Sequence, residues 1–470
     1  MSFEDRLYPL LGLYERFPAA AKTFIGRTYR ALPVGWRLGR RYREFQLLTE
    51  EAEGWSTEQA QQYQLRQLQE VLEHAAAHCP LYRERFAAAG FRPSALTCPA
   101  DLEQCPLLTK QDLIDQREGL VSTAFPASTR LYVTTGGSTG VPVGFYLQKG
   151  VSRPKEQAFL EAQWKRAGYF DGARLAVIRG HVTSDHSRGR IASYDATRGW
   201  LMLSSSHLSA QRLPEYLEAL ERFRPDLLHA YPSAALQLAE FLDQAGQSWR
   251  IPLQGLLAGS ERLTLPQKRL LERTFHCRVY RWYGHSERAV LAGEGRRSAL
   301  FYFWPAYGFT ELGPADEEGL QEVIVTSFHN HLMPLIRYRT GDRVRRVDTD
   351  EGAPLEFPWL AASEVAGRDQ EFLLSSTGRK ISLTAFNMHD QIFDDLYAVQ
   401  FFQEAAGRAE FRFVPGPRFQ RTRLPAIEAG IRRKLGEDFQ LTLREVRETE
   451  KSARGKHRWL VSQVAGQVKP

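Results

Sequence analysis

Short apolar runs alternate with helical stretches from about residue 130 to about residue 285, and this alternation restricts the fold more than any other feature of the chain. Neighbouring parallel strands must be joined by a crossover, usually a helix, so strand and helix patterns alternate along an α/β chain. The predicted strands are 131–135, 174–178, 226–230, 254–259 and 278–284, and the helical patterns between them are 151–168, 211–223, 233–245 and 266–275. The sequence therefore predicts a layered α/β domain with largely parallel pairing.

The rest of the chain predicts further units around this core. With 470 residues, the chain is long enough for more than one hydrophobic core. A helical pair is predicted at 55–90, strands at 321–328 and 335–347, and then a hairpin at 371–383 turning at 376–378, followed by helix, strand, helix and strand. We expect an N-terminal arm over 1–50, a large domain over 51–366 and a small C-terminal domain over 367–470.

Composition and charge limit the class of protein. Hydrophobic residues make up 43% and charged residues 25% of the chain, which is typical of a folded globular protein. The formal charge of +7 suits an anionic small molecule such as a nucleotide, and equally an acidic membrane surface; we expect no nucleic-acid partner. No run approaches the roughly 20 apolar residues of a membrane span. The cysteines lack CxxC spacing and the N-terminus lacks a signal-peptide pattern, so we expect a cytoplasmic protein.

A basic, aromatic segment lies near the N-terminus, over residues 22–44. Its arginines are mixed with aromatic and aliphatic residues, a composition that suits peripheral contact with the inner face of an anionic membrane or with a partner protein. Pro33 and Gly35 interrupt the helical pattern, which favours instead a basic arm folded over the main domain. Both interpretations are left open by the sequence.

A loop rich in glycine, serine and threonine directly follows the strand predicted at 131–135. Glycine allows several backbone N–H groups to converge on an anion, and hydroxyl groups add donors for phosphate oxygens. The loop lacks the Gly-Lys-Ser/Thr of a Walker motif and the spacing of a dinucleotide fingerprint. Alone, it fits a phosphate-binding loop and a plain turn equally well. Its residues are Thr134, Thr135, Gly136, Gly137, Ser138, Thr139 and Gly140.

Other motifs follow this loop along the chain. The segment 283–287 ends an apolar strand with a tyrosine that could stack on a base and a glutamate that could hold Mg²⁺. The segment 338–342 places an aspartate in a tight turn, where it could accept hydrogen bonds from ribose hydroxyls. The segment 454–456 is Arg-Gly-Lys, close to the C-terminus. Each of these motifs alone is more often ordinary structure.

Taken in order, these motifs resemble those of the acyl-adenylate-forming superfamily of acyl-CoA synthetases, luciferases and peptide-synthetase adenylation domains. The resemblance is most specific to the phenylacetate–CoA ligase branch and its CapK-like relatives from capsular polysaccharide gene clusters. It implies a large N-terminal layered α/β domain and a small, mobile α+β C-terminal domain, with ATP and Mg²⁺ as cofactors and CoA as a candidate acceptor. The matching segments are 63–91, 105–113, 134–143, 224–242, 259–264, 283–287, 334–342 and 367–381.

The resemblance implies a role in nucleotide binding for most of these motifs. The loop at 134–140 would close over the β- and γ-phosphates. Asp342 would hold the ribose hydroxyls, and Arg368 would approach the ribose near a hinge. Tyr283 would stack on the adenine. The residues expected around the adenine are Gly259, Ser260, Glu261, Trp282, Tyr283 and Gly284, with Arg262 in place of the usual proline.

The resemblance also implies three catalytic residues. Ser286 would contact the α-phosphate, and Glu287 would bind Mg²⁺. When a carboxylate attacks the α-phosphorus, two anions meet and charge builds in line with the departing pyrophosphate, so a mobile ammonium group stabilises the transition state. Lys456, which follows Gly455, is the candidate for this ammonium group, and Lys451 is the competing candidate.

A second half-reaction would follow rotation of the small domain. This rotation, about a hinge at 367–371, would withdraw Lys456 and admit a thiol acceptor. The hinge aspartate of the family is either Asp369 or replaced here by Glu371.

The acyl pocket is the least defined part of the expected site. By position it should lie between the phosphate loop and Tyr283, near Tyr231, Ser233 and Gly259. The segment 179–190 could recognise a polar or anionic substrate, or it could be a solvated surface loop. Its candidate side chains are His181, His186, Arg188 and Arg190.

Three functions are open on the sequence alone. The chain could be an acyl- or aryl-CoA ligase, with a carboxylic acid, ATP and CoA as its partners. It could instead pass the acyl-AMP to a sugar amine, a hydroxyl or a carrier thiol in surface polysaccharide synthesis. It could also be a non-catalytic scaffold of a polymer assembly, although a scaffold has no use for the retained residues of the nucleotide site. The oligomeric state is open, and a dimer is one alternative.

Overall fold

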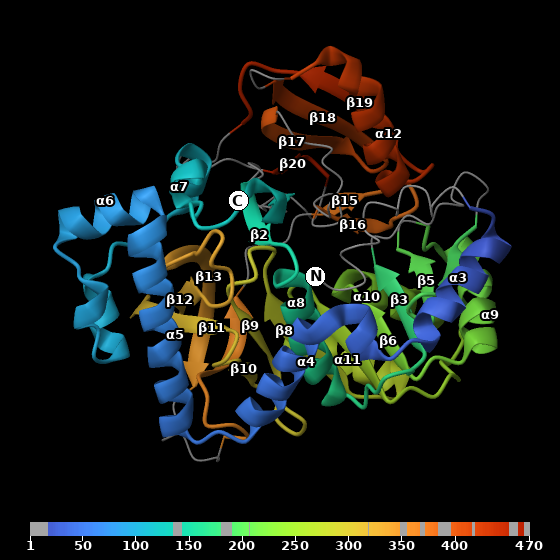
Figure 1. The fold of residues 1–470 in the computed structure, drawn as a ribbon. Helices are drawn as coiled ribbons and strands as arrows, with labels where there is room; N and C mark the ends of the chain where they lie inside the picture. Colours follow the sequence, from blue (N-terminus) through green and yellow to red (C-terminus); the bar gives the residue numbers. More distant parts are fainter. Residues whose placement is uncertain are drawn as a thin grey trace.

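The computed structural model describes residues 17–134, 143–179, 190–205, 207–317, 319–347, 355–366, 372–383, 396–415, 419–450 and 459–464. Within these residues, a twelve-stranded sheet forms the centre of a large domain, and a smaller four-stranded sheet lies above it in Figure 1. The strand order of the large sheet is β11-β12-β13-β14-β10-β9-β8-β7-β6-β3-β5-β4. The strands from β8 to β5 in this order are parallel to one another, and the others pair antiparallel.

The parallel strands coincide with the predicted alternation, except for β5, which the sequence pattern does not predict. They are β3 (Leu175–Arg179), β5 (Trp200–Ser204), β6 (Leu227–Ala230), β7 (Gly255–Gly259) and β8 (Val279–Gly284). The helices α9 (Leu213–Phe223), α10 (Pro232–Gln244) and α11 (Leu265–Phe275) fill the predicted helical stretches. Strands β6 and β7 are buried along their whole length, as expected where both faces of a parallel sheet are covered. The predicted α/β fold is therefore confirmed.

The other strands of the large sheet extend it with antiparallel pairs. They are β4 (Ala192–Asp195), β9 (Leu291–Glu294), β10 (Phe301–Phe303), β11 (Gly308–Ala315), β12 (Gln321–Ser327), β13 (Tyr338–Val347) and β14 (Ala361–Ala366). Strands β12 and β13 confirm the predicted strands at 321–328 and 335–347. Strands as short as β9 and β10 carry too few residues for a recognisable period, so the sequence does not predict them. The strand predicted at 131–135 is β1 (Arg130–Thr134), but it lies outside the large sheet, in a separate antiparallel hairpin with β2 (Gly144–Gln148) that precedes α8 (Ser152–Lys165).

The predicted helical pair is α5 (Thr57–His78) and α6 (Pro80–Ala89). Ser56 starts α5 with a capping box, because its hydroxyl accepts from the backbone of Gln59 while the Gln59 side chain accepts from the backbone N–H of Ser56. Pro80 fits the first position of α6, where a missing N–H costs no hydrogen bond. Figure 1 shows both helices and the short α7 (Lys110–Asp115) on the side of the large sheet that carries β11 to β13.

The basic arm consists of α3 (Ala19–Ala31) and the first part of α4 (Val34–Glu53), which bends where Gly39 adopts a φ of 81°. Its contacts with the large domain fit an arm folded over that domain, since a Cβ at Gly26 would lie 2.6 Å from the Cβ of Ala196. The expected boundary at residue 50 lies inside α4. Phe24 and Trp36 stay 74% and 71% exposed on the arm. The residues that α4 buries are Tyr42, Phe45, Thr49 and Ala52.

The small domain is a four-stranded sheet covered by one helix among its described residues (Figure 1). Its hairpin of β15 and β16 confirms the turn predicted at 376–378, where Gly378 has a φ of 81°. Arg379 holds the hairpin to the domain through an ion pair with Asp438. The elements are β15 (Phe372–Leu374), β16 (Lys380–Ser382), β17 (Leu396–Ala405), β18 (Arg408–Pro415), α12 (Leu424–Leu435), β19 (Gln440–Glu445) and β20 (Leu460–Ser462).

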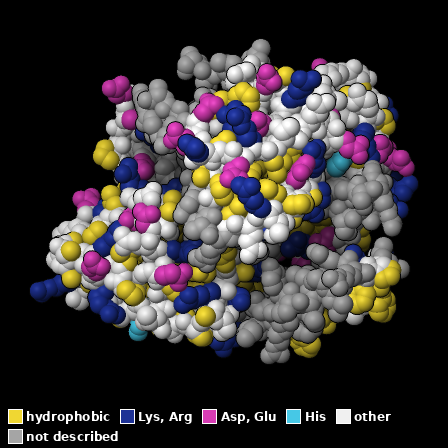
Figure 2. Space-filling view, turned by 90° about the horizontal axis from the view of Figure 1, so that it is seen from above, with side chains coloured by type: hydrophobic (Ala, Val, Ile, Leu, Met, Phe, Trp, Pro, Cys, Tyr) yellow, Lys and Arg dark blue, Asp and Glu magenta, His cyan; other side chains and the backbone are white. Residues whose placement is uncertain are grey.

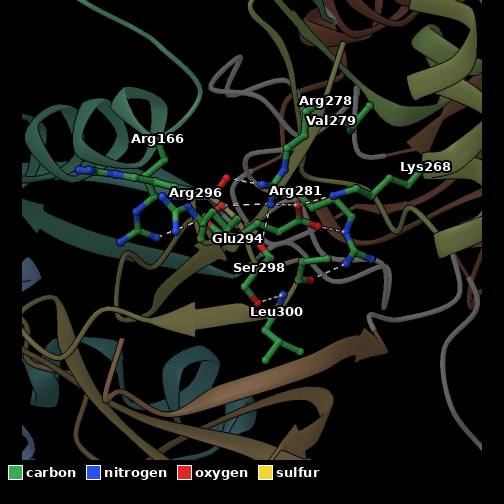
Figure 3. A network of polar contacts seen from close by, with 12 residues as sticks. Arg166, Lys268, Arg278, Val279, Arg281, Glu294, Arg296, Ser298 and Leu300 are labelled. Carbon is green, nitrogen blue, oxygen red and sulfur yellow. Dashed lines mark hydrogen bonds and ion pairs between the residues drawn. The ribbon is translucent and has the colours of Figure 1, made fainter. Parts of the chain in front are cut away.

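A buried ionic cluster around Glu294 joins β8, β9 and α11 (Figure 3). Glu294 is 0% exposed, and its carboxylate binds Lys268 and Arg281 directly, with a nitrogen of Arg278 3.8 Å away. A carboxylate this deeply buried is tolerated only when cations and hydrogen bonds replace its hydration. The cluster therefore fixes the strands that lead to the carboxyl end of β8.

The surface seen from above the small domain mixes both signs of charge around apolar side chains, and neither sign forms a continuous field on that face (Figure 2). Among the residues that the structure describes, no helix combines the length and the apolar character needed to cross a membrane.

Candidate nucleotide and acyl site

The carboxyl ends of the parallel strands form one edge of the large sheet, and the predicted motifs meet there. Strands β3, β6, β7 and β8 are neighbours in the sheet and run in the same direction. This edge therefore carries Arg179 at the end of β3, Tyr231 after β6, Gly259 at the end of β7 and Gly284 at the end of β8. In open α/β sheets, ligands bind in the crevice outside such carboxyl ends.

Tyr283 and Asp342 come from β8 and β13, which are not neighbours in the sheet, and their side chains meet. The Tyr283 hydroxyl donates a hydrogen bond of 2.9 Å to a carboxylate oxygen of Asp342. Burial, followed by the adjacent Asp342 carboxylate, raises the pKa of Tyr283 well above its ordinary value, so the phenol stays a neutral donor. The backbone N–H of Asp342 donates to the Thr340 hydroxyl over 3.0 Å, which fixes the turn. The structure thus brings together two residues predicted for the adenine and the ribose.

Glu287 lies in the turn that follows β8 and is 9% exposed. One carboxylate oxygen accepts a 3.2 Å hydrogen bond from the Tyr338 hydroxyl. The other lies 3.1 Å from Nδ1 of His285, without the alignment of a hydrogen bond. Ser286, between them in sequence, is exposed.

The surroundings of Glu287 fit the predicted Mg²⁺ role. Carboxylate oxygen is a ligand that Mg²⁺ prefers, and protein Mg²⁺ sites commonly use one or two carboxylates together with substrate phosphates. Among the described residues, no group of three or more acidic, histidine or cysteine side chains is arranged to hold a metal ion alone. A Mg²⁺ ion held by Glu287 would therefore take its remaining ligands from the nucleotide and from water.

Lys155 of α8 holds the turn that carries Glu287, a contact that the sequence does not predict. Its buried ammonium group donates to the backbone carbonyl of Arg288 over 3.1 Å and to that of Tyr307 over 2.9 Å. Arg288 has a left-handed φ of 53°, a conformation that costs energy for a residue with a side chain. Burial lowers the pKa of Lys155 to about 7. A buried lysine beside a helix start has no distinctive sequence signal, so only the fold reveals this positioning residue.

Gly259 lies under the indole ring of Trp282. A Cβ at residue 259 would lie 2.1 Å from Cε2 and 2.2 Å from Nε1 of Trp282, so only glycine allows this packing. The next residue, Ser260, has a left-handed φ of 69°. The indole N–H of Trp282 is buried and finds no hydrogen-bond partner among the described residues. The adenine role of Gly259 and Trp282 stays a prediction.

Glu261 and Ser233, predicted for the adenine and acyl pockets, bind each other. The Glu261 carboxylate accepts from the backbone N–H of Ser233 over 2.7 Å and from its hydroxyl over 3.0 Å. These bonds place a negative charge at the N-terminus of α10, where the helix dipole favours it. Arg262, which replaces the usual proline, forms a 2.6 Å ion pair with Glu364 of β14.

Arg179 is the first residue of the segment 179–190, whose side chains could recognise a polar or anionic substrate, but it is not among the candidate side chains predicted there. It ends β3, and its guanidinium lies over the ring of Tyr231, 4.7 Å from the ring centroid. One of its nitrogens donates to the Ser260 hydroxyl over 2.5 Å and another to Nε2 of His229 over 2.9 Å. The sequence signals for Arg179 are its position directly after the strand predicted at 174–178 and at the start of the segment 179–190.

Several predicted residues lie outside the described part of the chain. They are Thr135, Gly136, Gly137, Ser138, Thr139, Gly140, His181, His186, Arg188, Arg368, Asp369, Glu371, Lys451 and Lys456, and their roles stay predictions. Thr134 is described as the last residue of β1, and Arg190 is exposed. The thiol of Cys277 is unsuited to act as a nucleophile, because burial raises its pKa to about 12.

Asp342→Ala is expected to weaken ATP binding by about 1–3 kcal/mol, because the charge-assisted hydrogen bonds predicted to the ribose hydroxyls are lost. Isothermal titration calorimetry with ATP measures this change. Tyr283→Phe is the matched control, since it removes the hydroxyl that contacts Asp342 but keeps both the carboxylate and the aromatic ring. Unchanged ATP affinity in Asp342→Ala would contradict the ribose role.

Gly259→Ala is expected to displace the indole of Trp282 and to lower the free energy of unfolding by about 1–3 kcal/mol through overpacking. Near-UV circular dichroism reports the tryptophan environment, and urea unfolding reports the stability. Gly35→Ala is the control, because nothing lies within 4 Å of its added Cβ. An unchanged near-UV spectrum in Gly259→Ala would contradict the close packing of Trp282 on residue 259.

Among curated proteins, the chain is similar to phenylacetate–coenzyme A ligases and to protein CapK. The chain is 27% identical over 331 residues to the phenylacetate–coenzyme A ligase of Pseudomonas putida, a match that covers 68% of this chain and 73% of that protein. It is 26% identical over 303 residues to the phenylacetate–coenzyme A ligase of Escherichia coli (strain K12), covering 62% and 68%. It is 24% identical to protein CapK of Staphylococcus aureus over 280 residues, 59% of this chain and 61% of CapK, so the match spans less than two thirds of CapK. No protein-family model matches the chain.

Solved structures share the fold. The chain matches a crystal structure of 2-hydroxyisobutyryl-CoA ligase in complex with 2-HIB-AMP and CoA at a TM-score of 0.56 and 17% identity, covering 88% of this chain and 92% of that one. A second structure of that ligase, in the postadenylation state with R3-HIB-AMP, matches at a TM-score of 0.55. The order of the motifs, the sequence relatives and the fold agree: the chain is similar to the phenylacetate–CoA ligases and to CapK, and it has the fold of the adenylate-forming CoA ligases.

Proposed function

We propose that this protein uses ATP to convert a carboxylic acid into its acyl-AMP, with release of pyrophosphate, and then transfers the acyl group to CoA. The observation that supports this most directly is the meeting of Tyr283 with Asp342 beside the turn that carries Glu287. An aromatic ring, a carboxylate suited to ribose hydroxyls and a carboxylate suited to Mg²⁺ are the groups that ATP binding and adenylation need. They lie at or beside the edge of the sheet where ligands bind in this class of fold.

Each residue has a role that follows from its chemistry. Asp342 would accept hydrogen bonds from the ribose hydroxyls, which positions the α-phosphate for in-line attack. Glu287 would hold Mg²⁺, which supplies charge neutralisation at the phosphate oxygens. Ser286 is exposed and can donate to an α-phosphate oxygen. Lys456 would stabilise the charge that builds as the acid carboxylate attacks and pyrophosphate departs.

CoA is the acceptor that the relatives favour. Phenylacetate–coenzyme A ligases are named for that acceptor, and the matched 2-hydroxyisobutyryl-CoA ligase structure contains CoA. The thiol would attack the acyl carbon of the acyl-AMP and expel AMP, so that one thioester forms for each mixed anhydride broken.

The test is pyrophosphate release with ATP, Mg²⁺ and a panel of carboxylic acids, with and without CoA. We expect release that depends on the acid and that turns over repeatedly only when CoA is present. Hydroxylamine should trap the activated acid as a hydroxamate in the absence of CoA. Turnover that proceeds equally without CoA would overturn the assignment of CoA, and release that is independent of every acid would overturn the ligase function.

A further inference from the structure

Arg179 lies at the carboxyl end of β3, and its side chain reaches residues of the neighbouring strand ends. Its guanidinium lies 4.7 Å from the ring centroid of Tyr231 and 5.9 Å from that of Trp282. Its hydrogen bond to Ser260 reaches the residue directly after β7. One side chain from β3 thus touches residues at the ends of β6, β7 and β8. This is the region where the acyl pocket is expected, near Tyr231 and Gly259.

Among the described residues, the contacts of Arg179 supply no opposite charge. Arginine has no acceptor, so Nε2 of His229 must be the acceptor in their 2.9 Å hydrogen bond, and that imidazole is neutral. The second hydrogen-bond partner, the Ser260 hydroxyl, is also neutral. The Nε–H of Arg179 is buried and has no hydrogen-bond partner within the part of the chain that the structure describes. Among the residues that the structure describes, no carboxylate forms an ion pair with Arg179, which differs from the paired arginines of the surrounding domain.

A half-buried guanidinium without a counter-ion is costly unless a ligand supplies one. Removal from water weakens the hydration of the charge, and two aromatic faces recover only part of that loss. Ser260 holds its hydroxyl against Arg179 from a left-handed φ of 69°, a backbone strain that is typical of ligand sites. These residues hold the cation in place at the strand-end edge, and each of its two terminal nitrogens keeps a second N–H besides the one that binds His229 or Ser260.

We propose that Arg179 recognises a second negatively charged group on the substrate, and that the acid activated by this protein is a dicarboxylic acid. One carboxylate would face the nucleotide and react, and the other would accept hydrogen bonds from Arg179. The aromatic rings of Tyr231 and Trp282 would pack beside the carbon skeleton between the two groups. This inference rests on the proposed adenylation function and specifies its substrate class.

Arg179 could have two other roles, and each would change the activity in a different way. A purely structural arginine would affect all substrates equally, through stability. An arginine that contacts ATP would change the affinity for ATP rather than the choice of acid. Only a specificity residue changes the ratio of activities between a dicarboxylic acid and its monocarboxylic analogue.

The experiment is acid-dependent exchange of labelled pyrophosphate into ATP, measured with matched pairs of acids. The pairs are benzoate and isophthalate, phenylacetate and 3-carboxyphenylacetate, and butyrate and succinate. In at least one pair the wild type should favour the dicarboxylic acid, and Arg179→Met should lower kcat/KM for it by roughly 30-fold or more, because a desolvated charge contact is lost. Arg179→Lys should retain part of the preference, and the KM for ATP should stay unchanged in both variants.

Arg174→Met is the matched control, because Arg174 precedes the opposite end of β3 and pairs with Asp226. It should leave the preference between paired acids unchanged. Three results would overturn the proposal. The wild type could prefer the monocarboxylic acid in every pair. Arg179→Met could lose kcat/KM equally for both acids of a pair, or it could raise the KM for ATP. If none of the acids supports exchange, the proposed adenylation function is overturned, and this inference with it.

Discussion

Lys456→Ala is expected to lower acid-dependent pyrophosphate release by at least about 100-fold, the scale of loss when one preorganised charge-stabilising group is removed from a transition state. The attack of a carboxylate on the α-phosphorus brings two anions together, and the ammonium group compensates this charge only as the reaction proceeds. Because the interaction forms mainly in the transition state, kcat should fall while ATP affinity stays close to that of the wild type. Single-turnover assays and calorimetry separate these two quantities.

Lys451→Ala is the matched control for this prediction. It removes the same charge five positions earlier in the same basic segment, and we expect it to keep most of the activity. Full activity in Lys456→Ala would refute the assignment of the catalytic lysine. Loss of activity in Lys451→Ala alone would move that role to Lys451.

Glu294→Gln is expected to lower the free energy of unfolding of the large domain by about 3–5 kcal/mol, because it leaves buried cations without their counter-ion. Figure 3 shows Lys268 and Arg281 directed at this carboxylate from α11 and β8. Glutamine keeps the shape and one acceptor oxygen but removes the charge. Urea unfolding followed by tryptophan fluorescence measures the loss.

Glu50→Gln is the control for the ionic cluster. Glu50 forms an exposed ion pair with Lys165, 3.3 Å long, and exposed pairs contribute at most about 1 kcal/mol. A loss in Glu294→Gln no larger than in Glu50→Gln would contradict the view that the cluster fixes the strand that carries Trp282 and Tyr283.

The predictable part of the fold is the part with long, regular patterns. Parallel strands such as β6 and β7 are buried on both faces, so they read as continuous apolar runs, and the crossover helices between them show a helical period. Strands β9 and β10 escape prediction because both are short, and because β10 pairs with β14, a strand distant in sequence. Local propensity cannot define such short strands.

The candidate site divides in the same way. Tyr283 and Asp342 were predicted from ordered motifs, and the structure adds that their side chains touch. The segment 179–190 was a candidate for substrate recognition, but the contacts of Arg179 could not be predicted, because they arise from strand order. Lys155 could not be predicted, because the backbone carbonyls that it binds approach only in the folded chain. The bonds of Glu261 to Ser233 likewise join the start of α10 to the residues after β7, a contact that no local pattern encodes.

The most direct test of the central claim is isotope exchange between pyrophosphate and ATP in the absence of CoA. This exchange reports the reversible formation of acyl-AMP and needs no acceptor. The account predicts Mg²⁺-dependent exchange that appears only when a suitable carboxylic acid is added and that is lost in Lys456→Ala. Bound ATP without exchange for any acid in a panel that includes the dicarboxylic acids would contradict it.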